Sequence, residues 1–262
     1  EIDTADHFAA VQLFLQRANI VHPIATQPPD IQAIVEICQL VGGSPLALIL
    51  AASWVNTLPA RVIATEIRQN MDFLATDYTD LPERQRSIRA VYRASWQRLS
   101  SEERTIVSRL SVFNGGCSYV AAKHITEATL RELSIVANKS FLVQHAEVQR
   151  FSAHELLRQF AHERLEESGT AHTTYQAHAE YFLTWLADFE ADLKGHDQVG
   201  ALSAIDRDFE NIRTAWLWAV ENEQLMLLEK AFLSLTLYCR MRSRYDDGTS
   251  LLEVIESHDE AD

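Results

Sequence analysis

Glycine and proline are scarce in this chain, whose 262 residues include 8 glycines and 6 prolines. All-β folds need frequent tight turns built from these residues, so their scarcity disfavours an all-β architecture. No run of about 18 uncharged apolar residues occurs, which argues against a membrane-spanning helix. The first residues also lack the basic segment of a secretory signal. We therefore expect a helical protein of the cytoplasm that makes no membrane contact.

Cysteine is also rare, and its copies lie far apart in the sequence, at Cys38, Cys117 and Cys239. An odd number at such spacing forms neither a disulfide framework nor the CxxC pair of a zinc or redox site. This pattern fits a reducing compartment, in which thiols stay free.

Catalytic motifs are missing as well. The sequence contains no Gly-Lys dipeptide, so it has no GxxxxGK[ST] loop of the kind that holds nucleotide phosphates. His154 and Glu155 begin like the HExxH motif of zinc proteases, but Arg158 stands where the second histidine must be. A GxSxG nucleophile turn is absent too. We expect no metal site and no self-contained active site, so the chain is not an enzyme by itself.

Charge is distributed unevenly along the chain, whose net charge is −14. Residues 1–80 carry −6, residues 81–168 carry +3 and residues 169–262 carry −11. Such changes of sign suggest three separate domains with these boundaries. Two of the three would repel a nucleic-acid backbone.

Hydrophobic periodicity gives each segment a predicted structure. Apolar residues three and four positions apart predict four short helices in residues 1–80, which is typical of a small bundle. Residues 81–168 predict three helices, a β-hairpin formed by 141–144 and 148–151, and a last helix at 154–167. The order helix, helix, helix, hairpin is that of a winged helix.

The last segment predicts long amphipathic helices at 172–193, 197–221 and 225–238. Aromatic residues recur along one face of these helices, and such stripes more often form a core than a ligand site. Successive antiparallel helices could begin a TPR-like repeat array. The predicted fold is therefore mainly α, with a helical bundle, a winged-helix domain with a short β-hairpin, and an antiparallel helical arm.

The most informative segment is residues 42–52, with the sequence GGSPLALILAA. Gly42 and Gly43 allow positive φ values, and Pro45 suits the first turn of a helix. The apolar residues that follow predict a buried helix. A proline held rigidly at such a helix start could pack on a flat ligand such as adenine. An ordinary interhelical turn explains the same residues equally well.

His154 lies where the predicted hairpin gives way to a helix. An imidazole in a first helical turn can donate its N–H to a phosphate, and Arg158, one turn later, could reach the same side. The competing interpretation is a histidine that caps its own helix or satisfies a buried carbonyl.

Four segments occur in the order found in STAND-class ATPases, the NB-ARC-like signal-transduction switches, and the chain resembles bacterial multidomain regulators of this class. The segments are VQLFLQRA at 11–18, GGSPLALILAA at 42–52, LSSEER at 99–104 with LSVFNGG at 110–116, and FSAHELLRQFA at 151–161. In this family a Gly-x-Pro loop places its proline on the adenine, and the histidine of an MHD-like motif contacts the β-phosphate of ADP. The resemblance implies that Pro45 contacts adenine and His154 contacts phosphate, with Gly43 and Arg158 as further candidates.

The chain departs from the family pattern at two places. Ser44 stands where the family often has Leu, and Ala153, His154 and Glu155 stand for Met-His-Asp. Both departures keep the matched proline and histidine. The resemblance also implies that Walker A and B motifs precede residue 1, in an upstream nucleotide-binding domain that is the first expected partner. ADP or ATP would bind only with that domain present, and none tightly to this chain alone.

These expectations combine into one hypothesis, in which residues 1–168 are the lid and lock of an ADP/ATP switch in a signalling or transcriptional regulator. Residues 169–262 begin a helical arm that contacts protein partners. Two alternatives stay open. The winged helix could bind DNA directly through Arg131 and Lys139, although its acidic neighbours make nucleic acid an unfavourable partner. The chain could also be a helical scaffold in which the candidate site residues are only structural.

Overall fold

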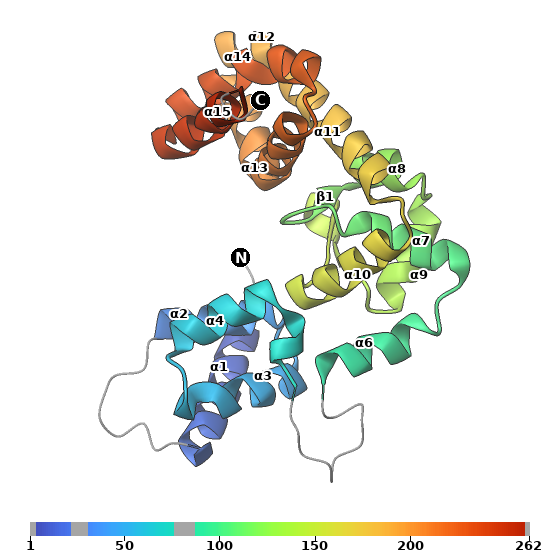
Figure 1. The fold of residues 1–262 in the computed structure, drawn as a ribbon, viewed down its shortest axis with the longest axis vertical. Helices are drawn as coiled ribbons and strands as arrows, with labels where there is room; N and C mark the ends of the chain where they lie inside the picture. The colour runs from blue at the N-terminus through green and yellow to red at the C-terminus, as the bar shows by residue number, and fades with distance from the viewer. Residues whose placement is uncertain (1–3, 22–30, 76–86, 260–262) are drawn as a thin grey trace. The chain divides into compact units, whose positions relative to one another are not determined.

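A computed structural model describes residues 4–21, 31–75 and 87–259, and in these ranges the chain is mainly helical with one small antiparallel sheet (Figure 1). The predicted fold class is confirmed. Backbone contacts divide the chain into two compact units, the first formed by 1–104 and 153–164 and the second by 105–152 and 165–262. The boundary expected between residues 80 and 81 lies outside the described residues, and the three-domain division stays a prediction.

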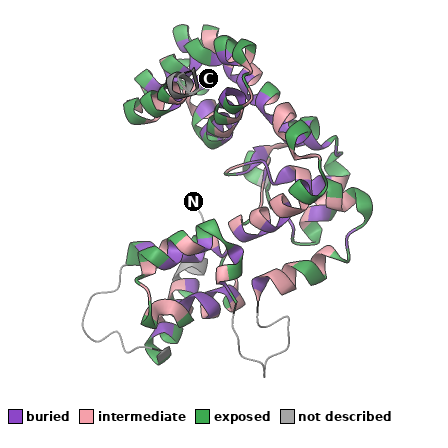
Figure 2. Ribbon diagram, viewed as in Figure 1, coloured by how far each residue is buried: buried purple, intermediate pink, exposed green. Residues whose placement is uncertain are grey.

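The first unit is a bundle of short helices. Its elements up to residue 96 are α1 (Thr4–Val21), α2 (Ile31–Leu40), α3 (Pro45–Ala52), α4 (Ala60–Gln69) and α6 (Ile88–Trp96), with 3-10 turns η1 (Ser53–Asn56) and η2 (Met71–Phe73). Buried positions, purple in Figure 2, form its core, and the largest of these side chains include Phe14, Ile37, Leu48 and Ile63. The bundle predicted for this part of the chain is therefore present.

Helix α7 (Ser101–Leu110) begins at a capping box that the sequence predicts. The Ser100 backbone N–H donates to Glu103 Oε2 at 2.8 Å, and the Glu103 N–H donates to Ser100 Oγ at 3.3 Å. Each side chain thereby satisfies a backbone donor that the first turn of a helix leaves unpaired.

A winged-helix arrangement follows α7. Its elements are β1 (Cys117–Ser118), α8 (Tyr119–Thr126), α9 (Leu130–Asn138), β2 (Val143–His145), a 3-10 turn η3 (Ala146–Val148) and β3 (Arg150–Ser152). The strands form an antiparallel sheet in the order β1-β3-β2, in which Phe151 pairs with both Cys117 and Gln144. The predicted hairpin is present but lies about two residues later than expected. Strand β1 is not predicted from the sequence, because two residues show no alternation.

The remaining elements are helices. Helix α10 (Glu155–Glu167) lies mostly in the first unit. The second unit contains α11 (Ala171–Asp188), α12 (Glu190–Lys194), α13 (Gln198–Glu221), α14 (Leu225–Met241) and α15 (Tyr245–Asp259), and α13 contacts α11, α14 and α15. Phe182 and Trp216 are fully buried, as expected of the aromatic stripes, and the Trp216 indole N–H donates to the Leu251 carbonyl at 2.9 Å. The helix expected over 172–193 divides at Phe189, whose N–H bonds back to Leu186 in a tighter final turn.

Candidate functional site

The segment GGSP forms the turn between α2 and α3. Gly42 and Gly43 have φ values of +60° and +66°. The Gly43 N–H donates to the Cys38 carbonyl at 3.0 Å and the Gly42 N–H donates to the Gln39 carbonyl at 3.0 Å. This pair of bonds is a Schellman motif, which ends α2 and satisfies two of its last carbonyl groups. Pro45 then occupies the first position of α3, as predicted.

The imidazole of His154 lies directly against this turn. A Cβ atom added to Gly42 would be 2.5 Å from His154 Nδ1 and 2.6 Å from its Cγ, so the ring occupies the space that a side chain at residue 42 would need. His154 itself precedes α10, and its carbonyl accepts the Arg158 N–H at 2.9 Å. Two motifs far apart in the sequence therefore meet within the first unit.

The other candidate residues are close in sequence to the two that make this contact. Pro45, Gly43 and His154 are exposed, and apart from Gly43 and its chain neighbours no atom of the described residues lies within 4 Å of the position that a Cβ of Gly43 would take. The Arg158 guanidinium is paired with Glu155, with Nε donating to Oε2 and an Nη donating to Oε1, both at 2.9 Å. The structure thus brings His154 and the glycine turn together, while Arg158 is held by its neighbour on α10. The ligand-binding roles of all four residues stay predictions.

Packing of α10 fixes the position of His154. Leu156 and Phe160 are fully buried in the core of the first unit. The Gln159 side-chain amide donates to the Arg68 carbonyl at the end of α4, at 2.8 Å. The first turns of α10 are therefore anchored to the bundle by both apolar and polar contacts.

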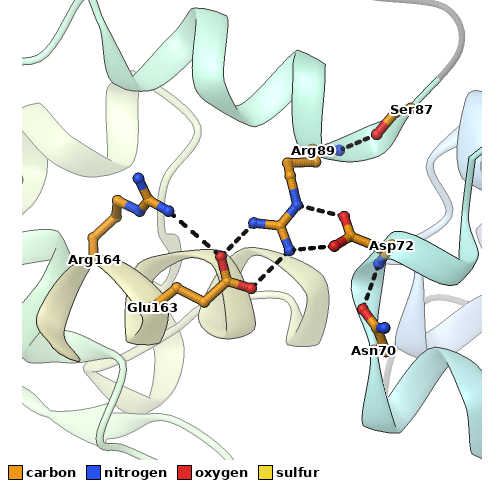
Figure 3. Close-up of polar contacts among 6 residues, drawn as sticks. All are labelled: Asn70, Asp72, Ser87, Arg89, Glu163 and Arg164. Carbon is orange, nitrogen blue, oxygen red and sulfur yellow. Dashed lines mark hydrogen bonds and ion pairs between the residues drawn. The ribbon is translucent and has the colours of Figure 1, made fainter. Parts of the chain in front are cut away.

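A charged cluster adds a second anchor for α10. Figure 3 shows the Arg89 guanidinium of α6 between two carboxylates, Asp72 of η2 and Glu163 of α10. One Arg89 Nη donates to Asp72 Oδ2 at 3.0 Å and to Glu163 Oε1 at 2.8 Å. These bonds hold the pKa of Glu163 below its usual value. Sequence reasoning missed this cluster, because its members share no motif or spacing.

Chemically, the turn and His154 offer an exposed imidazole beside backbone that has no side chain in the way. An imidazole N–H can donate to a phosphate oxygen, and a helix start such as that of α10 favours negative charge. A proline ring on the same turn can lie flat against a heterocycle. The described residues hold no group of three His, Cys, Asp or Glu side chains that could bind a metal ion.

The second unit contains the other candidate surface, the winged helix. Arg131 and Lys139 are exposed at the two ends of α9, and Leu130 and Ile135 of the same helix are also partly exposed. Arg150, the first residue of β3, is instead paired within the protein. Its guanidinium donates to both oxygens of Asp208 on α13, at 2.8 and 2.7 Å, and the two side chains are 14% and 10% exposed.

Asn211 continues this polar contact within the second unit. Its Oδ1 accepts the Asn114 N–H at 2.9 Å, and its Nδ2 donates to the Gly116 carbonyl at 2.9 Å. His178 of α11 is fully buried beside Phe113, at 5.4 Å between ring centroids, and burial lowers its pKa to about 4. Helices α11 and α13 therefore contact residues 113–116 of the winged helix through buried groups.

Comparison with curated proteins finds distant relatives. The chain is 28% identical over 224 residues to "Putative HTH-type transcriptional regulator Rv0890c" of Mycobacterium tuberculosis, a match that covers 81% of this chain and 25% of the relative. A protein of Mycobacterium bovis named "Putative HTH-type transcriptional regulator Mb0914c" matches to the same extent. An uncharacterized protein of Mycobacterium tuberculosis, Rv0894, is 29% identical over 174 residues, or 62% of this chain and 44% of that protein.

The chain thus spans about a quarter of the length of the HTH-type relatives that it matches. No family model matches the sequence, and no solved structure matches it significantly. The relatives support a link to regulators in general. Separately, none of the helices in the described ranges has the length and apolar character needed to cross a bilayer.

Proposed function

We propose that this chain is the nucleotide-responsive part of a transcriptional regulator, in which the first unit closes over ADP or ATP held by a separate P-loop domain. The observation that carries the proposal is the contact between the Gly42 turn and the His154 ring. The resemblance to STAND-class switches assigns these two motifs to one nucleotide, and a shared ligand requires that they lie together. The names of the distant relatives support the regulatory context.

The residues present fit such a ligand. Pro45 is exposed at the start of α3 and would pack on the adenine, while the exposed His154 imidazole would donate to a phosphate. Arg158 is paired with Glu155, so its proposed role is to stabilise the first turn of α10. It would contact the nucleotide only after the Arg158–Glu155 ion pair breaks. The nucleotide supplies charge and a flat ring, and the chain supplies contacts that differ between ADP and ATP. A difference in these contacts would shift the population between closed and open states.

The test needs a protein that carries this chain together with its nucleotide-binding domain. We expect His154→Ala to speed ADP dissociation about tenfold or more, because a hydrogen bond to a charged group contributes about 1.5 to 3 kcal/mol. Basal transcriptional output should rise in the same variant. His196→Ala removes an exposed histidine after α12 and should change neither quantity. An ADP off-rate in His154→Ala equal to that of the parent protein refutes the phosphate role.

A second candidate function is direct DNA binding by the winged helix, and the names of the HTH-type relatives favour it. Helices α8 and α9 form a helix-turn-helix, and the exposed side of the second helix carries Arg131 in its first turn and Lys139 directly after its end. In this reading both cations contact phosphates. Replacing each with Gln should lower the salt dependence of duplex DNA binding by about one unit, whereas Arg213→Gln on α13 should leave it unchanged. Equal DNA binding by all three variants would contradict this alternative.

A further inference from the structure

A surface hollow of about 670 Å³ lies in the second unit, between the start of α11 and the end of α13. Its chemically distinctive lining residues are Glu166, His172, Tyr175, Trp218 and Glu221. The rings of His172 and Trp218 meet edge to face, with centroids 5.4 Å apart. The hollow is large enough for a small organic ligand, since ligand sites commonly measure about 300 to 1,000 Å³.

The formally charged side chains that line this hollow are both acidic. Two carboxylates, those of Glu166 and Glu221, contribute to its wall, and neither lysine nor arginine is among the described residues that line it. The dipoles of the two helices oppose each other here, because α11 begins where α13 ends. The two lining carboxylates therefore favour a cationic ligand.

The aromatic residues indicate which kind of cation would bind. The indole of Trp218 is half-buried, and indole is the ring that attracts cations best over its face. A planar guanidinium can stack on such a ring and at the same time donate two parallel hydrogen bonds to a carboxylate. The combination of indole, phenol and carboxylate thus suits a guanidinium better than it suits an anion or a neutral sugar.

We propose that this hollow binds a guanidinium group, presented either by a free alkylguanidine or by an arginine side chain of a peptide. Trp218 and Tyr175 would provide the aromatic surface and Glu221 the bidentate acceptor. The site lies on the helical arm, outside the unit that carries the proposed nucleotide contacts, so it stands whether or not those contacts exist.

Binding can be followed through the Trp218 indole N–H signal in ¹H–¹⁵N NMR spectra of the whole chain, assigned by its loss in Trp218→Phe. The probes are N-acetyl-arginine amide, its neutral isostere N-acetyl-citrulline amide, and agmatine. We expect N-acetyl-arginine amide to shift this signal saturably at millimolar concentration and to bind at least about tenfold more tightly than the citrulline compound, which corresponds to about 1.4 kcal/mol. Agmatine binding as well as the amide identifies a free alkylguanidine as sufficient, and binding of the amide alone identifies a peptide side chain.

Two variants test the role of the carboxylate. Glu221→Gln should weaken binding of N-acetyl-arginine amide about fivefold or more while the fold is unchanged, because residue 221 is exposed. Glu210→Gln removes the same charge from an exposed position of α13 that does not line the hollow, about 16 Å along the helix from residue 221, and should weaken binding less than Glu221→Gln does. Equal binding of the citrulline compound, equal weakening by Glu210→Gln, or no shift with any probe up to about 10 mM would overturn the proposal.

Discussion

The contact between Gly42 and His154 makes a sharp prediction about two neighbouring glycines. Gly42 and Gly43 have nearly the same φ, +60° and +66°, so that an alanine at either position incurs a similar penalty of about 1 kcal/mol for a positive φ. They differ in their surroundings. A Cβ added at residue 42 would lie 2.5 Å from the His154 ring, whereas a Cβ added at residue 43 would lie in open space.

The difference between the two variants can be estimated from that geometry. Real Cβ atoms essentially never lie within 3.0 Å of another heavy atom, so the His154 ring must move, or α10 must shift. Such overpacking costs about 1 to 3 kcal/mol. We therefore expect Gly42→Ala to destabilise the first unit by about 2 to 4 kcal/mol and Gly43→Ala by about 1 kcal/mol.

Native-state hydrogen exchange followed by mass spectrometry is the suitable assay, because peptides from α2 and α10 report the opening of the first unit separately from the second. A double-mutant cycle isolates the contact. In a His154→Ala background the extra cost of Gly42→Ala should fall to that of Gly43→Ala, which gives a coupling energy of about 1 to 3 kcal/mol. Equal destabilisation by the two glycine variants, or additivity in the cycle, would show that the ring does not pack on the turn.

Three further predictions concern charged and buried groups. Arg89→Gln should destabilise the first unit by about 1 kcal/mol in urea unfolding, because both carboxylate partners are partly exposed. Because the pKa of Glu163 is lowered, the parent should lose stability as pH falls from the usual glutamate pKa through that lowered value, and Arg89→Gln should reduce this loss. The pKa of His178 is lowered from 6.5 to about 4, so as pH falls the unfolded chain takes up a proton on this residue before the folded chain does. The free energy of unfolding should therefore decrease as pH falls from 6.5 to about 4, by up to about 3 kcal/mol. His178→Phe should remove this pH dependence from a series of thermal unfolding curves. Asp208→Asn leaves Arg150 with a neutral partner and should lower the free energy of unfolding by about 2 to 3 kcal/mol, as measured by differential scanning calorimetry. Asp206→Asn, at the more exposed ion pair with Arg242, should lower it by less than about 1 kcal/mol.

Local signals in the sequence account for most of the helices. The capping box of Ser100 and Glu103 and the Pro45 helix start are predicted and confirmed, because each depends on residues within one turn. Helix α15 lies beyond the last helix that the sequence predicts, and it contains a glycine, a residue that is unfavourable inside helices. A Cβ on that glycine would be 3.2 Å from Cys239 Cβ, so Gly248 instead lets α14 and α15 approach closely.

Contacts between distant residues could not be obtained in this way. The Arg89 cluster joins three elements whose spacing carries no pattern, and the seating of His154 on Gly42 depends on how α10 packs into the bundle. The resemblance to a known family supplied the expectation that the two motifs belong together. Residue periodicity alone could place each motif at a helix end, but not beside the other.

The cations of the winged helix bear on which part of a regulator this chain forms. Asp208 engages Arg150 of β3, and the cations carried by α9 and the residue after it are Arg131 and Lys139. Two phosphate contacts give a salt slope of about −2, whereas DNA-binding domains with about six to ten contacts lose about 10³ to 10⁵ in affinity between 50 and 200 mM salt. Electrostatic attraction through this helix would therefore be weak, and the exposed Leu130 and Ile135 beside these cations suit a protein contact better. Since the HTH-type relatives are about four times longer than the match, their name can describe a part that this chain does not cover.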